Sequence, residues 1–265
     1  MCATVTVMTK PSAGTIDQLA SDGFVLLQQL CSTALVQALL EVCLRRTRVV
    51  RTALGAQPIG IGSAAGYLEI VQRSPGRWDI PITPQQFQID DRQMPWWPLV
   101  AAALGEDAEH SFSGVVSSEP GSPAQDWHID SPHEAAEHRP AHAINVMLAL
   151  HDTPLVMGPT ECARRSHLLT NHLSNPLLVR EELVYQHAGT SPYYLVKGTQ
   201  CRVPDSVASP MAAGSCLIFD DRLLHRGLAN RSDTMRHVAY FSYRRKGYCT
   251  NTHFESQRSV FDTPS

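Results

Sequence analysis

Two histidines and one carboxylate are spaced so that they could hold a metal ion. His128 and Asp130 lie two positions apart in the segment QDWHID, and residues i and i+2 of an extended chain point to the same side. His225 follows the apolar run GSCLIFDDRLL. Two histidines and one carboxylate on one face would leave three coordination positions of the metal ion open. This suits a non-haem Fe(II) oxygenase, which must admit a cosubstrate, a water and O2.

Arg236 could bind an acidic cosubstrate beside that metal. It follows His225 by eleven residues, near the start of the strand-like run MRHVAYFSYRR. A turn and a returning strand would bring its guanidinium into the same cavity, where a planar fork of donors can hold a carboxylate with two hydrogen bonds. Each residue alone has an ordinary explanation, such as a chance His-x-Asp or a surface turn, but their joint spacing favours a metal site.

The elements that must position these residues change in character along the chain. Residues 15–109 predict helices and short strands, with Ser32 as an N-cap signal before an amphipathic run. Residues 110–250 predict many short strands separated by Gly- and Pro-containing turns. We therefore expect a mainly β protein, a sandwich or jelly roll with the N-terminal helices packed on one sheet. No linker is visible, so residues 1–265 are expected to form one domain, with a flexible tail at 1–14.

The composition excludes several classes of function. The 265 residues carry 22 basic and 25 acidic side chains, a net charge of −3, which gives no basic surface for nucleic acid. No window of roughly 18 residues is apolar enough to cross a bilayer. The partner that we expect is a small-molecule substrate, with no nucleic acid and no membrane, and a homodimer is left open.

Seven cysteines are scattered along the chain without a CxxC pair. This spacing argues against a disulfide framework or a zinc ribbon, so most cysteines should be small buried side chains. A reducing compartment fits this usage. Because the chain shows neither a secretory nor a peroxisomal signal, we expect a cytoplasmic location.

Three residues beside the motif are expected to support it. We interpret Trp127 as a packing anchor. Asp220 and Asp221 fit equally well a contact that orients a ligand histidine and a loop cap.

Two irregular segments, residues 131–142 and 170–200, are expected to form the walls of the substrate entrance. The first contains His133, His138 and His142, whose spacing resembles a metal cluster only superficially. Because its residues offer little apolar surface to bury, we interpret it as a solvated lid loop.

Together, these motifs resemble the phytanoyl-CoA dioxygenase family of Fe(II)/2-oxoglutarate-dependent oxygenases. QDWHID matches the His-x-Asp segment of that family, and GSCLIFDDRLLHRGLANRSDTMRHVAYFSYR matches its distal segment, including the spacing of eleven. GPTECARRSH stands where the family often carries a Gly-x-Thr run that ends in Pro-Gly-Ser-His. The resemblance covers most of the chain. One departure is that Arg164 and Arg165 replace the Pro-Gly, which we expect to alter a loop near the entrance.

The resemblance implies two sets of site residues. The iron ligands would be His128, Asp130 and His225. The residues that contact 2-oxoglutarate would be Arg236 at its distal carboxylate, Thr160, Gln125 and, from the strand ahead of the core, Gln72 or Arg73.

The resemblance also implies the fold and the reaction. The fold would be a double-stranded β-helix, which is a cupin-like jelly roll. With Fe(II) and O2, 2-oxoglutarate would yield succinate and CO2 while a small organic molecule of natural-product biosynthesis is oxidised. Hydroxylation is the default outcome, and desaturation, epoxidation or rearrangement use the same site.

Two alternatives stay open. A cupin-like metalloenzyme without 2-oxoglutarate would have no need of Arg236. A non-catalytic small-molecule-binding jelly roll would be free to lose its ligands, whereas all three are present.

Overall fold

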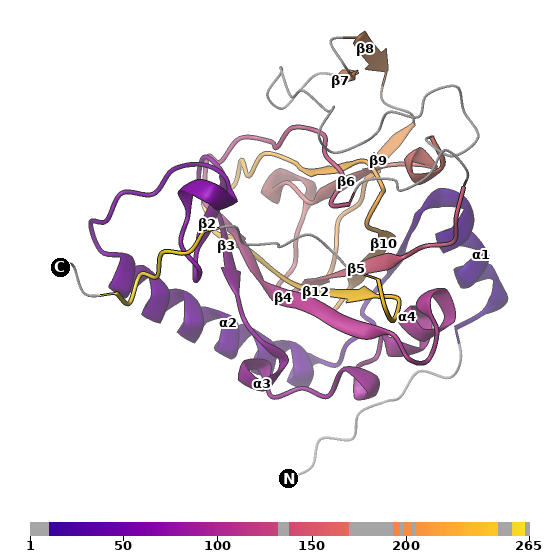
Figure 1. Cartoon of the computed structure of the whole chain (residues 1–265), viewed down its shortest axis with the longest axis horizontal. Coiled ribbons are helices and arrows are strands. Elements are labelled where there is room, and N and C mark those ends of the chain that lie inside the picture. Colours follow the sequence, from indigo (N-terminus) through magenta and orange to yellow (C-terminus); the bar gives the residue numbers. More distant parts are fainter. Residues whose placement is uncertain are drawn as a thin grey trace.

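A computed structural model describes residues 11–131, 138–169, 193–196, 199–202, 205–248 and 256–262. Its centre is a seven-stranded antiparallel sheet (Figure 1). In spatial order its strands are β1 (Phe24–Leu27), β10 (Cys216–Asp220), β5 (Ala143–Ala149), β12 (Arg236–Arg244), β4 (Glu109–Ser118), β3 (Arg77–Pro81) and β2 (Val71–Ser74).

A smaller antiparallel sheet lies on the other side of the molecule from the long helix. Its strands are, in spatial order, β11 (His225–Gly227), β6 (Thr160–Ala163) and β9 (Ser206–Ala208). Separately, β7 (Tyr193–Val196) pairs antiparallel with β8 (Thr199–Arg202).

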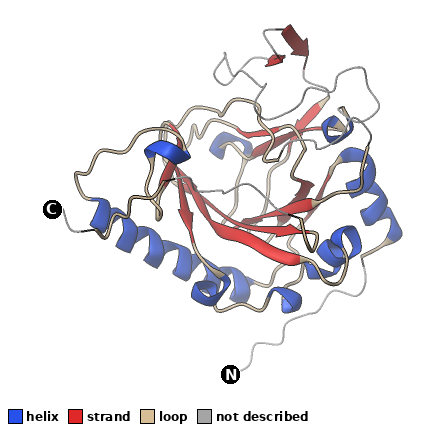
Figure 2. Ribbon diagram, in the orientation of Figure 1, coloured by secondary structure: helices blue, strands red, loops and turns tan. Residues whose placement is uncertain are grey.

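Helices gather on one side of the larger sheet (Figure 2). They are α1 (Ala13–Asp22), α2 (Thr33–Leu54), α3 (Pro84–Phe87) and α4 (Trp97–Leu104). The chain also forms short 3-10 turns, which are η1 (Ser63–Ala65), η2 (Asp91–Gln93), η3 (Leu155–Met157) and η4 (Ser166–Leu168). None of the helices in these described ranges is long and apolar enough to cross a membrane.

The long helix α2 begins and packs as its sequence predicts. The Ser32 hydroxyl accepts a hydrogen bond from the backbone N–H of Leu35 at 3.3 Å, which satisfies one of the free donors at the helix start. Its buried residues recur at helical spacing and include Leu39, Cys43 and Val50. This apolar stripe packs against the sheet.

The larger sheet has two chemically different faces, because alternate residues of a strand point to opposite sides. The helix face carries apolar side chains such as Val115, Ile144 and Phe241, all fully buried in the main core. The inner face, opposite the helices, carries the polar side chains of Arg77, Asp79, Ser118, Asn145, Arg236, Tyr240 and Ser242. Seven buried polar side chains on one face indicate a functional interior rather than a second core.

The structure confirms the mainly β architecture with helices on one sheet. It corrects two details of the N-terminal prediction. The strands β1, β2 and β3 do not merely support the core, because they pair within the same sheet as the later strands. The predicted tail at 1–14 is too long by two residues, since α1 begins at Ala13, and residues 1–10 lie outside the described residues. The single-domain division stays a prediction.

Candidate metal and cosubstrate site

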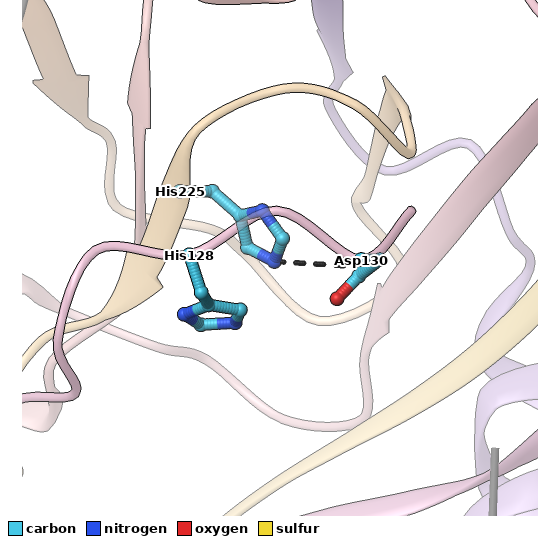
Figure 3. Close-up of side chains that lie close together, drawn as sticks. All are labelled: His128, Asp130 and His225. Carbon is cyan, nitrogen blue, oxygen red and sulfur yellow. Dashed lines mark ion pairs between the residues drawn. The ribbon is translucent and has the colours of Figure 1, made fainter. Parts of the chain in front are cut away.

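Backbone contacts bring the three predicted metal ligands together. His128 and His225 face each other in an antiparallel bridge, in which each N–H donates to the other carbonyl at 3.0 and 2.9 Å. The N–H of Asp130 donates to the carbonyl of Asp221 at 2.9 Å. One ligand atom from each of the three side chains lies within 4.8 Å of the others (Figure 3). The sequence therefore predicted a group that the fold assembles.

Each histidine is oriented by a main-chain carbonyl. Nδ1 of His128 lies 2.8 Å from the carbonyl of Asp126, and Nδ1 of His225 lies 2.9 Å from that of Leu223. A ring that donates its Nδ1 proton to a carbonyl leaves the lone pair of Nε2 for a metal. Nε2 of His225 lies 3.7 Å from Oδ2 of Asp130, which is close enough for both atoms to share one ion.

The carboxylate of Asp130 is held from the inner face of the sheet. Asn145 on β5 donates from Nδ2 to Oδ2 of Asp130 at 2.6 Å. The hydroxyl of Ser242 on β12 donates in turn to Oδ1 of Asn145. The sequence analysis did not find these two residues, because only the pairing of β5 with β12 brings them beneath Asp130.

The protonation state of His128 suits a metal ligand. Burial, followed by the charge of His225, lowers the pKa of His128 to about 4. His128 is therefore neutral near pH 7, as a metal ligand must be. Two imidazoles and one carboxylate form a donor set that fits Fe(II).

Arg236, at the start of β12, has the properties of an anion-binding residue. It is 2% exposed, and its Nη2 donates to the hydroxyl of Ser118 at 3.0 Å. Its Nε and Nη1 have no hydrogen-bond partner among the described residues. Burial, with the charge of Arg77, lowers its pKa well below the usual value. Two free buried donors on one guanidinium fit the carboxylate of 2-oxoglutarate.

Arg77 is a second buried arginine of this region, which the sequence analysis missed. It lies on β3 opposite Ser118, and Ser118 also lies opposite Arg236, so all three side chains share the inner face. Arg77 is 1% exposed. The available signal was the short run RWDIP, in which Arg77 and Asp79 occupy the same strand face.

Thr160 and Gln125 lie around Gly227 in the smaller sheet. Thr160 is directly opposite Gly227 in the pairing of β6 with β11. Gln125 accepts from the N–H of Gly227 at 3.1 Å through Oε1, and its own N–H donates to the carbonyl of Gly227 at 2.8 Å. A Cβ on Gly227 would lie 2.3 Å from Nη1 of Arg77. The structure thus places Thr160 and Gln125 beside the arginine pair.

Gln72 is not brought to this site. It lies opposite Trp78, which packs on the helix-face core, so Gln72 points away from the inner face. Arg73, the other residue indicated by the sequence, pairs with the inner-face residue Asp79 at 2.7 Å. Adjacent residues of a strand point to opposite faces, so Gln72 and Arg73 lie on different sides of the sheet, and the local pattern does not reveal which of them faces inward.

The supporting residues have clear roles. Trp127 is buried, and Cζ of Arg226 lies 4.4 Å from the centre of the Trp127 ring. This contact agrees with the prediction of a packing anchor. The Asp220 carboxylate pairs with Arg222 at 2.6 Å. The Asp221 carbonyl holds the backbone of Asp130, while its carboxylate lies 3.3 Å from His142. In the described part of the chain, neither aspartate side chain contacts His128 or His225.

The prediction of a solvated loop is wrong for His142. This side chain is buried, pairs with Asp221 and stacks on Tyr248 at 4.2 Å between ring centres. Its ring adds apolar contact that the polar local sequence does not suggest. His133 and most of the predicted entrance walls, residues 132–137 and 170–192, lie outside the described residues.

Arg164 and Arg165 connect β6 to the N-terminal elements. Arg164 pairs with Asp22 at 2.5 Å and lies over the ring of Phe24 at 5.4 Å. Arg165 has a φ of 63°, a left-handed conformation that favours glycine. None of the contacts described for Arg164 and Arg165 involves a metal ligand, although Cys162, two residues before Arg164, lies opposite His225.

The chain matches the family model of phytanoyl-CoA dioxygenase (PhyH) over residues 19–238. Together with the jelly-roll fold and the metal-ligand group, this match defines a non-haem oxygenase. The chain belongs to the PhyH family. Its cofactors are Fe(II), 2-oxoglutarate and O2, and the alternatives without 2-oxoglutarate or without catalysis are set aside.

Solved structures share the jelly-roll fold and confirm the predicted fold class. The α-ketoglutarate-dependent carbocyclase SnoK from nogalamycin biosynthesis is 18% identical with a TM-score of 0.59, over 89% of this chain and 84% of that one. AviO1 from Streptomyces viridochromogenes is 16% identical with a TM-score of 0.60, over 93% and 100%. HygX from Streptomyces hygroscopicus, with nickel and 2-oxoglutarate bound, is 12% identical with a TM-score of 0.59, over 90% and 89%.

Proposed function

We propose that His128, Asp130 and His225 hold Fe(II), and that the enzyme uses it to oxidise a small organic molecule of natural-product biosynthesis. The observation that carries this proposal is the convergence of two carbonyl-oriented imidazoles and one carboxylate within 4.8 Å. The bound iron and 2-oxoglutarate supply O2 activation with release of succinate and CO2.

The cosubstrate lies, in this proposal, between the metal and the arginines of the inner face. Arg236 holds the distal carboxylate with its free buried donors, and Thr160 and Gln125 contact the cosubstrate from the smaller sheet. These side chains bind and orient the cosubstrate. The proposal no longer includes Gln72, because it faces the helices.

The class of substrate is inferred from relatives in natural-product pathways. SnoK and the epimerase SnoN come from nogalamycin biosynthesis, HygX has been crystallised with hygromycin B, and ThoJ is a monooxygenase. We take hydroxylation as the default outcome, with desaturation, epoxidation and rearrangement as alternatives, because the outcome depends on how the substrate is held. Asp130 is present, so the ligand position left open in halogenating relatives is filled.

The proposal includes a cytoplasmic location. The free state of the four described buried cysteines, Cys31, Cys43, Cys162 and Cys216, supports a reducing compartment. The homodimer stays an open prediction, for which light scattering of the purified protein is the measurement.

The test is iron content and succinate formation in His128→Ala, Asp130→Ala, His225→Ala and Arg236→Ala. The first three should lose bound iron and all succinate formation, because each removes one of three protein ligands. Arg236→Ala should keep its iron but lose roughly a hundredfold or more in affinity for 2-oxoglutarate.

His110→Gln is the matched control, because His110 contacts Asp91 and Ser113 outside the metal group. It should keep both iron and succinate formation. Wild-type succinate formation in any ligand variant would remove that residue from the site, and an unchanged 2-oxoglutarate affinity in Arg236→Ala would refute the cosubstrate assignment.

A further inference from the structure

Arg77 and Arg236 are two buried positive charges with no carboxylate within ion-pair distance among the described residues. Burial lowers the pKa of Arg77 to about 10, and burial with the charge of Arg77 lowers the pKa of Arg236. Two like charges that are buried on one sheet face, on either side of Ser118, are costly unless an anion joins them.

The other two buried arginines of the described part, Arg222 and Arg226, differ in this respect, and so does the half-buried Arg73. Arg73 pairs with Asp79 at 2.7 Å, Arg222 with Asp220 at 2.6 Å and Arg226 with Glu161 at 2.7 Å. The sheet can therefore supply carboxylates to its buried arginines. Arg77 and Arg236 are exceptions among the described residues, which fits a site for the carboxylate of a bound ligand.

Both guanidiniums also keep unused donors. Nη2 of Arg77 donates to the carbonyls of Pro123 and Leu228 at 3.2 and 3.1 Å, which fixes the side chain in place. Its Nε and Nη1, like those of Arg236, are buried without a hydrogen-bond partner in the described ranges. Four buried N–H-bearing atoms without acceptors match the lone pairs of a carboxylate.

Gly227 makes room for the guanidinium of Arg77. Its would-be Cβ lies 2.3 Å from Nη1 of Arg77 and 2.8 Å from Oε1 of Gln125. The φ of Gly227 is not in the left-handed region, so space rather than backbone torsion explains the glycine. Thr160 lies opposite Gly227, so the surroundings of Gly227 adjoin the proposed cosubstrate site.

We propose that Arg77 is a second cosubstrate-binding residue, which holds the distal carboxylate of 2-oxoglutarate together with Arg236. This inference rests on the proposed function, in which Arg236 takes that carboxylate. The competing explanation is structural, namely that Arg77 only braces the carbonyls of Pro123 and Leu228.

The experiment separates the two explanations with a pair of ligands. Calorimetry on the Ni²⁺-loaded enzyme measures the dissociation constants of 2-oxoglutarate and of 2-oxobutanoate, which lacks the distal carboxylate. Arg77→Met should weaken 2-oxoglutarate binding at least about thirtyfold, because one partner of a buried charge pair is lost. Binding of 2-oxobutanoate should change less than about threefold, because it never used Arg77. Arg77→Lys should be intermediate for 2-oxoglutarate, since a point charge cannot form the fork.

Arg226→Met is the matched control, because it removes a buried arginine whose partner is Glu161. It should leave both dissociation constants unchanged. Equal losses for both ligands in Arg77→Met, or no loss for 2-oxoglutarate, would overturn the inference. If Arg77→Met does not fold, the dissociation constants of 2-oxoglutarate and 2-oxobutanoate in Arg77→Lys, each compared with the wild-type value, decide between the two explanations. A wild-type enzyme that binds no 2-oxoglutarate would instead overturn the proposed function, and this inference with it.

Discussion

Asn145 controls the proposed iron site without binding the metal, because its amide fixes the carboxylate of Asp130. Asn145→Leu should weaken metal affinity by about 10- to 100-fold, the usual cost of losing a contact that orients a ligand. A Co²⁺ titration under anaerobic conditions measures this. Ser242→Ala, which removes only the hydrogen bond to Asn145, should have a smaller effect. A wild-type dissociation constant in Asn145→Leu would show that Asp130 needs no such support.

His237 should make stability depend on pH. Burial, with the charge of His151, lowers its pKa to about 4 from the ordinary 6.5. The unfolded chain therefore binds more protons between these values, so the free energy of unfolding should fall as the pH drops from 6.5 towards 4. The contribution of His237 is at most about 3 kcal/mol.

Urea unfolding of the metal-free protein at several pH values measures this dependence. The pKa values of His128 and His167 are also lowered by burial, so the informative quantity is the difference between wild type and His237→Gln. The variant should lose less stability on acidification. If the free energy of unfolding depended on pH equally in wild type and in His237→Gln, His237 would not titrate in this range.

At the residue scale, local spacing predicted the three side chains of the proposed metal site but not the residues around them. His128 and Asp130 are two positions apart in the sequence, and His225 and Arg236 are eleven positions apart, so both spacings are visible in the sequence alone. Arg77 and Asn145 reach the site through strand register, which pairs residues far apart in sequence. No local pattern reveals which strands will be neighbours.

At the element scale, the junction between β6 and η4 contains a strained residue. Arg165 adopts a φ of 63° and its side chain is exposed. Arg165→Gly should raise the free energy of unfolding by about 0.5–1 kcal/mol, because glycine adopts this conformation without a steric cost. Arg164→Gly is the matched contrast and should destabilise, since Arg164 pairs with Asp22. Chemical denaturation of both variants measures whether each change raises or lowers the free energy of unfolding. Destabilisation by Arg165→Gly would contradict the strain argument.

Element types were easier to predict than element partners. The strands after residue 110 and the helix α2 follow from alternation, turns and a cap that the sequence carries locally. The membership of β1, β2 and β3 in the same sheet does not, because it depends on packing against strands that come much later. The inward direction of Arg73 and the outward direction of Gln72 are a further consequence of strand pairing.

At the scale of the whole molecule, the two faces of the larger sheet have different roles. The helix face contributes to the apolar core that stabilises the fold, and the inner face carries the polar side chains of the proposed site. Leu39→Ala removes a buried side chain beneath the helix face and should cost about 2–5 kcal/mol. The metal group on the other side does not contact this residue, so the folded variant should bind iron with wild-type stoichiometry. Denaturation combined with iron analysis tests both statements. A loss of iron in the folded variant would show that the faces are coupled.

The location of the metal tests the account most directly. Anomalous diffraction at the iron edge, from crystals grown anaerobically with Fe(II) and 2-oxoglutarate, locates every bound iron ion in the chain. The account predicts one strong peak within coordination distance of Nε2 of His128, a carboxylate oxygen of Asp130 and Nε2 of His225. A peak bound by other residues, or no peak beside these three in crystals that contain iron, would contradict it.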